Sequence, residues 1–235
     1  MTKRQVSETF SLKDLVNSKI CSTFAASNKN KTTIMENFII ENGVFIGCKE
    51  DIKGDVVIPD DVTRIGIYAF YENSSLTSVT IGNGVTRIGY GAFRGCSTLA
   101  SITIPDSVKS IGIYAFYDCP NLTPKRDNVL SDGRIVAYKA FCGDMTCRGF
   151  QYEEGKTYEM DGEIGLCWRG FHACLNPFDM FNYYYGRLGK NVVIHEVYLE
   201  GVSEERAEDS KVVCSKITIG RRLTLEDMCK IVNPS

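Results

Sequence analysis

Apolar and polar residues recur at an interval of 23 positions in the middle of the chain, where segments 56–76, 78–99 and 101–122 align. The aligned apolar columns are Ile58, Ile81 and Ile104; Val62, Val85 and Val108; Ile65, Ile88 and Ile111; Ala69, Ala92 and Ala115; Phe70, Phe93 and Phe116; and Leu76, Leu99 and Leu122. A repeat of this length predicts a solenoid, because one rung cannot bury its apolar face except against its neighbours. We expect about three rungs.

Each repeat begins with a short run in which apolar and polar residues alternate. In the second repeat Val79 and Ile81 flank Thr80, and in the third Thr103 precedes Ile104. Successive side chains of a strand point to opposite faces, so the valine and isoleucine side chains should face inward and the threonines outward. We therefore expect one strand per rung with a polar outer face, then a turn and a brief helical or irregular return.

The third repeat reads IPDSVKSIGIYAFYDC from Ile104, and this pattern resembles the BspA-type leucine-rich repeats of bacterial and protist proteins. The segment from Met35 looks like the hairpin that commonly opens such arrays, with Glu41, Asn42 and Gly43 as its turn. The resemblance implies a right-handed solenoid over residues 35–124 with an N-terminal hairpin cap. It also implies a role in recognition and no catalysis.

The N-terminal residues 1–34 are mostly polar, and only Ser11–Ile20 gathers apolar side chains on one side of a helix. We expect an N-terminal arm or a loosely docked capping helix here. No secretion signal is recognisable, and no apolar run approaches the roughly 20 residues of a membrane span. The ten cysteines are therefore expected to be reduced thiols in a cytoplasmic protein.

The net charge of −2, from 27 basic and 29 acidic residues, provides no overall attraction to nucleic acid or to an anionic membrane. A protein is therefore the expected partner. The sequence leaves the oligomeric state open.

A different pattern begins after Leu122 and predicts a small mixed α+β domain over residues 127–235, so the chain as a whole is assigned to the α+β class. Strands are expected at 134–141, 150–152, 157–160, 192–198 and 211–219, with a strand or loop at 165–174. Pro177 favours a helix start, and that helix is predicted to run to about residue 185. A closing helix at 223–232 should begin at Thr224, because acidic residues follow in its first turn.

The last rung of such a solenoid leaves Ile104, Ile111 and Phe116 facing no further repeat. Terminal rungs need a cap to stay soluble. Because the linker after Leu122 is too short to reach far, we expect residues 129–136 to pack on the last rung and to continue its sheet.

Four cysteines of the second domain, Cys142, Cys147, Cys167 and Cys174, lie near His172 in the sequence. Their spacings lack the Cys-x2-Cys turn typical of tetrahedral zinc sites. We expect structural thiols, no bound metal and no cofactor. A cysteine nucleophile would need a paired base, and the sequence fixes no histidine against a cysteine.

Residues 136–232 resemble small domains of unknown function that follow pentapeptide or leucine-rich repeats in phage and bacterial proteins. The resemblance rests on the segments 147–150 and 155–158, on a Gly-Phe-His strand at 170–172, and on a helix that starts with proline. It implies no activity. By analogy with such phage-borne modules, the expected role is that of a phage or mobile-element protein that binds and modulates a host protein such as a defence component.

A second resemblance is to ADP-ribosyltransferase folds, in which a strand leads to a helix with a tyrosine and then to a strand with a catalytic glutamate. It implies that Tyr183 or Tyr184 stacks on nicotinamide and that Glu196 or Glu200 orients the ribose. The early strand that carries histidine or arginine in those enzymes has only Tyr138 and Lys139 here. An NAD-handling enzyme in the second domain, targeted by the repeats, is the alternative function.

Two surfaces of the solenoid are candidates for binding a partner protein, which is the function that the sequence favours. The first gathers residue types that are common at interface hot spots, all outside the apolar columns: Tyr68, Tyr71, Tyr90, Arg94, Tyr114 and Tyr117. The second is the outward strand face: Ser78, Thr80, Ser101 and Thr103.

Overall fold

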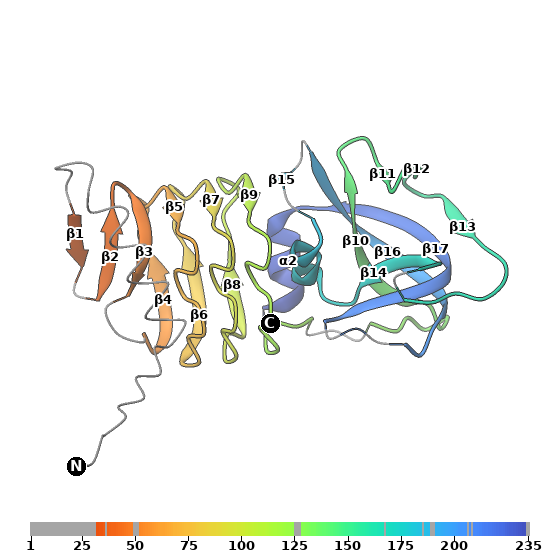
Figure 1. Cartoon of the computed structure of the whole chain (residues 1–235), viewed down its shortest axis with the longest axis horizontal. Coiled ribbons are helices and arrows are strands. Elements are labelled where there is room, and N and C mark those ends of the chain that lie inside the picture. Colours follow the sequence, from red (N-terminus) through yellow and green to blue (C-terminus); the bar gives the residue numbers. More distant parts are fainter. Residues whose placement is uncertain are drawn as a thin grey trace, which may run out of the picture.

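The molecule is elongated, with the repeats at one end and a closed sheet at the other (Figure 1). The computed structural model describes residues 32–35, 37–48, 52–124, 128–166, 168–184, 186–188, 191–205, 207 and 209–233. The helix predicted at Ser11–Ile20 lies outside the described residues.

Two sheets of parallel strands run along the repeats. One contains β4 (Gly54–Ile58), β6 (Leu76–Ile81) and β8 (Ser101–Thr103). The other contains β3 (Val44–Cys48), β5 (Arg64–Ile65), β7 (Arg87–Ile88) and β9 (Ser110–Ile111). Equivalent residues pair across repeats, so Val79 pairs with both Val56 and Ile102. The sequence period thus becomes the register of the sheets.

The aligned apolar columns form the core of the repeats, and every member of the predicted columns is buried. The rings of Phe70, Phe93 and Phe116 stack along the solenoid, with centroids 5.0 and 5.4 Å apart. The outward positions follow the alternation too, since Thr80 and Thr103 are exposed.

A column of glycines, which was not among the predicted columns, marks the closest approach of the repeat backbones. A Cβ atom at Gly89 would lie 2.6 Å from the carbonyl oxygen of Gly66, and one at Gly112 would lie 2.5 Å from the backbone nitrogen of Tyr90. Side chains do not fit at this distance, so glycine is needed here for space.

A β-hairpin covers the first repeat, as predicted. Its strands β2 (Phe38–Glu41) and β3 meet at Asn42 and Gly43, whose φ angles of 53° and 72° suit a tight hairpin turn. Phe45 stacks on the first ring of the phenylalanine column at 4.8 Å. A further strand, β1 (Thr32–Met35), pairs with β2, so the sheet begins before the boundary expected at residue 35.

Four strands of the C-terminal half close into a ring: β10 (Ile135–Cys142), β14 (Phe171–Cys174), β16 (Val192–Val202) and β17 (Lys211–Leu223). The ring closes because the long strand β17 pairs with β14 near its start and with β16 further on. Strand β13 (Thr157–Glu159) adds to β17, and β11 (Thr146–Cys147) and β12 (Phe150–Gln151) form a separate ribbon.

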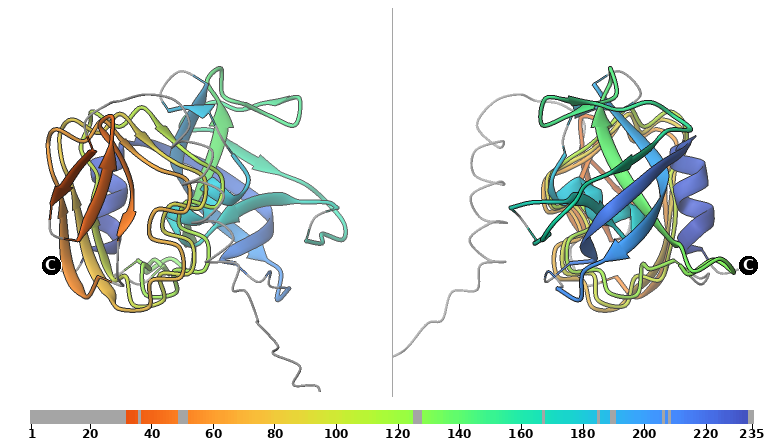
Figure 2. Two further views of the ribbon diagram at one scale, coloured as in Figure 1. Left: turned by 60° about the vertical axis from the view of Figure 1, so that its left-hand side comes forward. Right: turned by 90° about the vertical axis from the view of Figure 1, so that its right-hand side faces the viewer.

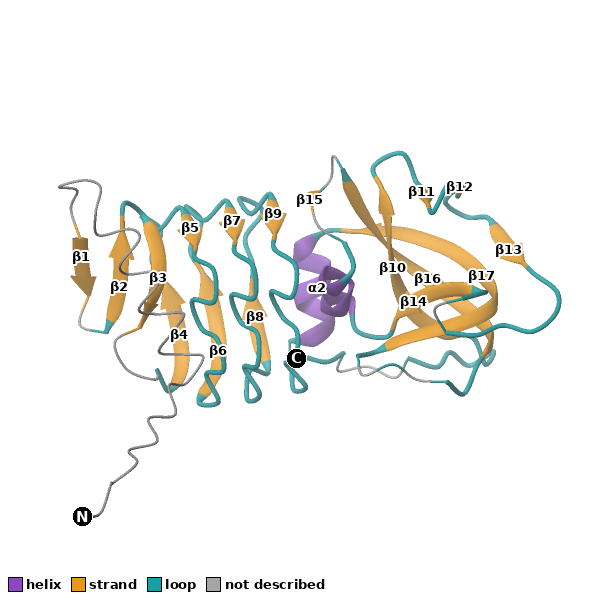
Figure 3. Ribbon diagram, in the orientation of Figure 1, coloured by secondary structure: helices purple, strands orange, loops and turns teal. Residues whose placement is uncertain are grey.

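The helical segments of this half are short (Figure 3). The 3-10 helix η1 (Pro177–Asn182) begins as expected, with the Asn176 side chain accepting a hydrogen bond from the backbone of Phe178. The predicted extension to residue 185 is wrong, because η1 ends at Asn182 and strand β15 (Gly186–Arg187) follows closely. Helix α2 (Leu225–Val232) begins after Thr224 as predicted. The described part of the C-terminal half is therefore mainly β.

The C-terminal half covers the last repeat, although not with the segment expected. Residues 129–136 were expected to continue the repeat sheet, but Val129 bridges to the nearby Ile135 and is 61% exposed. Strand β15 (Gly186–Arg187) instead pairs with β9, with Gly186 opposite Ile111. The expected continuation of the sheet was wrong, because the sheet edge is filled by β15, which lies much further along the chain. Val136 does belong to the hydrophobic cluster that includes the last repeat, and Leu130 packs against that cluster.

Helices η1 and α2 complete this cap. The ring of Phe178 lies 4.8 Å from that of Phe116. Helix α2 lies beside β8 in each view (Figures 1 and 2), and Asn233 after it accepts hydrogen bonds from Ser101 Oγ and Ile102 N at 2.9 Å each. One hydrophobic cluster therefore extends from the first hairpin through the repeats to Val232.

Candidate functional site

Five tyrosine rings form a continuous ladder along the return segments of the repeats. Neighbouring centroids lie 5.1 to 5.7 Å apart, and each contact is edge to face. In spatial order the rings belong to Tyr71, Tyr68, Tyr90, Tyr114 and Tyr117. Because edge-to-face aromatic pairs are favourable, each ring holds its neighbours in place. Five of the six residues predicted on this surface thus come together.

In the middle repeat the tyrosine stands one position earlier than in its neighbours, and the ladder stays continuous. Tyr68 and Tyr114 have φ angles of 56° and 57°, and the equivalent residue between them is Gly91, with φ of 56°. A Cβ atom at Gly91 would lie 2.5 Å from Cε1 of Tyr68, so the Tyr68 ring occupies the space of a missing side chain. The adjacent Tyr90 then bridges the two outer rings.

Arg94, the sixth residue, lies over one end of the ladder. Its guanidinium carbon is 5.2 Å from the ring centroid of Tyr117 and 5.9 Å from that of Tyr114, within the range of a cation–π interaction. Tyr90 is 36% exposed. Burial, and then its hydrogen bond with Tyr68, raise the pKa of the Tyr90 hydroxyl. The surface therefore presents phenol groups and one positioned cation.

The strand face is partly occupied by contacts within the protein. The hydroxyls of Ser78 and Thr77 both donate to Asp55 Oδ1, at 2.7 and 2.9 Å, and these bonds lower the pKa of Asp55. Ser101 donates to Asn233. Of the four predicted residues on this face, Thr80 and Thr103 are exposed.

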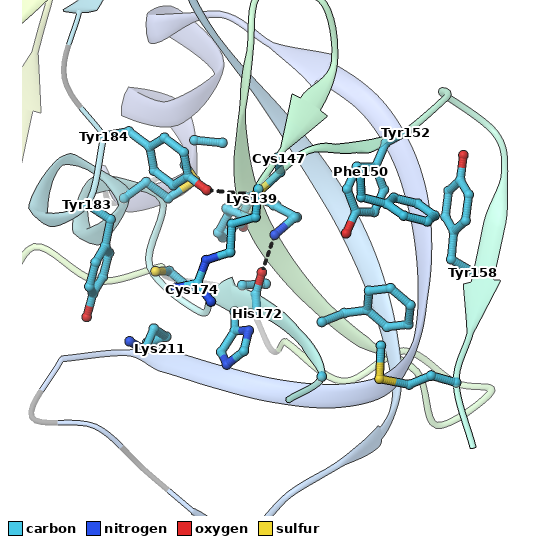
Figure 4. A pocket seen from close by; sticks show the side chains of 18 of the residues that line it. Lys139, Cys147, Phe150, Tyr152, Tyr158, His172, Cys174, Tyr183, Tyr184 and Lys211 are labelled. Carbon is cyan, nitrogen blue, oxygen red and sulfur yellow. Dashed lines mark hydrogen bonds between the residues drawn. The ribbon is translucent and has the colours of Figure 1, made fainter. Parts of the chain in front are cut away.

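A second candidate site is a pocket of about 920 Å³ beside the strand ring of the C-terminal half. Its walls come from β10, β13 and β14 and from the segments that precede and follow them (Figure 4). Pockets of this size are large enough for a small-molecule ligand.

Lys139 extends from β10 into this pocket and is 6% exposed. Its Nζ donates a hydrogen bond to the backbone oxygen of His172 at 2.8 Å (Figure 4). Burial lowers the pKa of the Lys139 amine, and the neighbouring Cys147 opposes that effect. In the sequence this lysine is noticeable only as a departure from the ADP-ribosyltransferase pattern. The available signal was its position inside an otherwise apolar strand.

Two further polar groups of the pocket are altered by burial. The pKa of His172 falls to about 4, first because of burial and then because of the charge on Lys139. The Tyr184 hydroxyl lies 3.1 Å from Cys147 Sγ (Figure 4), and burial raises the pKa of Tyr184.

The four residues of the alternative enzyme hypothesis do not converge. Tyr183 and Tyr184 line the pocket, but neither Glu196 nor Glu200 does. Glu196 accepts a hydrogen bond from Tyr198 at 2.9 Å, and Glu200 forms an ion pair with Lys216 at 3.1 Å. The nicotinamide and ribose contacts that the resemblance implies therefore have no common site in the described residues, which speaks against an ADP-ribosyltransferase.

The cysteines do not form a recognisable metal site within the described residues, where no group of three potential ligands is found. Burial raises the pKa of Cys174 well above its ordinary value, and Cys142 is exposed. Cys167 lies outside the described residues. The expectation that the protein needs no metal stays a prediction.

Residues 39–142 match the family described as BspA type leucine rich repeat region (6 copies). The matched stretch includes the repeats and most of the hairpin that covers them, and it agrees with the pattern of the sequence. Residues 135–231 match a domain of unknown function, DUF7666. This match agrees with the resemblance of residues 136–232 to small domains of unknown function.

Two solved structures are similar to part of this chain. A leucine rich repeat protein of T. pallidum is 29% identical, with 40% of this chain and 48% of that chain covered and a TM-score of 0.36. A leucine rich cell surface protein of Faecalibacterium prausnitzii is 28% identical, with 42% and 31% covered and a TM-score of 0.35. The chain thus spans less than half the length of either protein.

A comparison with curated proteins gives no match. Neither helix in the described part of the chain has the length and apolar character needed to cross a bilayer.

Proposed function

We propose that this protein is a recognition scaffold that binds a partner protein through the tyrosine ladder, defined as Tyr68, Tyr71, Tyr90, Tyr114 and Tyr117 together with Arg94. Leucine-rich repeats commonly display a rigid surface for a protein ligand. The observation that carries the proposal is the continuity of the ladder across successive repeats.

Two properties of the ladder support binding. Tyrosine offers a large amphipathic surface, and tyrosine and arginine dominate the energetics of many interfaces. The ring contacts also hold the side chains before a partner arrives, so that little side-chain entropy is lost on binding. The strand face is the weaker candidate, because Ser78 and Ser101 already bond within the protein.

The test compares two double variants of the full chain as baits for affinity capture from the native host. Tyr90→Ser with Arg94→Ala alters the ladder, and Thr80→Ala with Thr103→Ala alters the strand face to a similar extent. We expect quantitative mass spectrometry to find one protein that the wild type and the threonine variant retain and the ladder variant loses. With the purified partner, the ladder variant should bind at least about 100-fold more weakly, which is about 2.7 kcal/mol.

A partner lost from the threonine variant alone would assign binding to the strand face instead. A partner retained equally by both variants would contradict binding through either surface. Melting temperatures of the two variants, measured alongside, separate a lost contact from a lost fold.

A narrower proposal concerns the biological setting. The resemblance of residues 136–232 to phage-borne modules supports a phage or mobile-element protein that modulates a host protein, such as a defence component. This setting rests on that resemblance alone. The identity of the captured partner tests it, because a metabolic enzyme or a structural protein in place of a defence component would contradict it.

A further inference from the structure

The pocket of the C-terminal half carries an excess of positive charge. Among its described lining residues, the cationic side chains are Lys139, Arg148, Arg169 and Lys211, whereas Glu159 is the single carboxylate. A concave site lined by one sign of charge concentrates ions of the opposite sign. The lining therefore favours an anionic ligand over a neutral or cationic one.

Flat aromatic rings form one wall of the same pocket. The rings of Phe150, Tyr152 and Tyr158 contact one another with centroids 4.8 to 5.4 Å apart (Figure 4). Phe150 is 48% exposed, and Trp168, which lines the same pocket, is 64% exposed. Such exposed rings offer stacking faces to a planar ligand.

Lys139 adds a buried charged group between this wall and Tyr184 (Figure 4). Its amine donates to the backbone oxygen of His172, and no ion pair to a carboxylate is found for it in the part of the chain that the structure describes. Cys147 and the rings of Phe141 and Tyr152, at 5.6 and 5.7 Å from Nζ, are its other neighbours. A buried ammonium without a carboxylate partner is costly. An anion placed beside it would offset that cost.

We propose that this pocket binds a small organic anion that carries a flat ring, the chemical class to which nucleoside monophosphates belong. The anionic group pairs with Lys139, and the ring lies against Phe150, the exposed member of the aromatic wall. The pocket volume of about 920 Å³ accommodates a ligand of this size. This site is separate from the tyrosine ladder, so it does not depend on the proposed recognition function.

The single tryptophan of the chain makes the test specific to the site. The chain has one tryptophan, and Trp168 lines the pocket, so tryptophan fluorescence reports on this location. Adenosine 5′-monophosphate and pyridoxine 5′-phosphate are titrated as two different ring anions. Adenosine tests the need for the anion, and inorganic phosphate tests the need for the ring.

We expect a saturable fluorescence change below about 1 mM for at least one ring anion, and binding at least about tenfold weaker for adenosine and for inorganic phosphate. Saturation by neither ring anion would overturn the proposal. Equal binding of adenosine and its monophosphate would overturn the anion requirement, and equal binding of inorganic phosphate would overturn the ring requirement.

Three variants of the full chain test the assignment of residues. Lys139→Met should weaken binding of the ring anion at least about tenfold, whereas Lys156→Met, an exposed lysine outside the pocket, should leave it unchanged. Phe150→Ala should weaken the ring anion more than inorganic phosphate, and it removes an exposed side chain, so the fold should persist. Unchanged binding in both Lys139→Met and Phe150→Ala would show that the ligand lies elsewhere.

Discussion

Burial, rather than ion pairing, sets the chemistry of individual residues in the pocket. The pKa of His172 is lowered to about 4 by burial and by the nearby charge on Lys139. In the unfolded chain the same imidazole takes up a proton near pH 6.5. Between these values the unfolded chain binds a proton that the folded chain does not, so stability falls as the pH falls from about 6.5 toward 4.

We therefore expect the free energy of unfolding to decrease between pH 7 and pH 4.5 by less in His172→Gln than in the wild type. Because His172 is only partly buried, solvent screening keeps this difference modest. Urea denaturation of both proteins at the two pH values checks it. Identical losses in the two proteins would mean that His172 does not titrate differently on unfolding.

The residues of the two candidate sites differ in how visible they are in the sequence. The tyrosines recur at or next to equivalent positions of successive repeats, so the repeat period brings them close to one surface. Lys139 and His172 instead meet across the strands β10 and β14. No local period brings these strands together, and a lysine within a strand is more often an outward-facing residue. The pocket therefore becomes visible only in the folded chain.

Each repeat depends on its neighbours. The middle strand β6 is therefore the element most sensitive to a charged residue at an inward-facing apolar position. Ile81 is 3% exposed. We expect Ile81→Asp to lower the free energy of unfolding by about 4 kcal/mol or more, because the carboxylate has no buried partner.

The adjacent Thr80→Asp is the matched control, since Thr80 is exposed on the same strand. It should change stability by no more than about 0.5 kcal/mol. Thermal and urea denaturation of the two variants measure the difference. Equal stability of both would remove the assignment of inward and outward faces.

The elements that follow a sequence period were predicted well, and the others were not. Strands β6 and β8 and the hairpin turn at Asn42 and Gly43 follow from local patterns. The early end of η1 and the location of β15 do not, because β15 is held by its pairing with β9 rather than by its own sequence. Two-residue strands of this kind have too few positions to show an alternation.

At the scale of the whole molecule, the repeats and the C-terminal half share one core. The side chain of Asn233 adds hydrogen bonds between the two halves. Its Oδ1 accepts hydrogen bonds from Ser101 Oγ and from the backbone nitrogen of Ile102. Asn233→Ala leaves the Ile102 amide without this partner and should cost about 1–3 kcal/mol. We expect the whole protein to unfold in one transition at a lower temperature, as measured by calorimetry.

Lys230→Ala on the same helix is the comparison variant. The exposed pair of Lys230 with Glu226 should contribute little to stability, because solvent screens it. Two separate transitions in the Asn233→Ala protein would indicate that the two halves fold independently. The fragment 1–124, which lacks the covering segments, should aggregate, and a soluble and stable fragment would contradict the shared core.

The contact between β8 and Asn233 also has a consequence for biosynthesis. Ser101 and Asn233 are separated by 132 residues in the chain, so the repeats leave the ribosome well before their cover exists. At roughly 5–20 residues per second this interval is on the order of ten seconds. During that time the nascent repeats expose Ile104, Ile111 and Phe116 at an open sheet edge. A chaperone that holds this edge on the nascent chain would therefore raise the yield of folded protein.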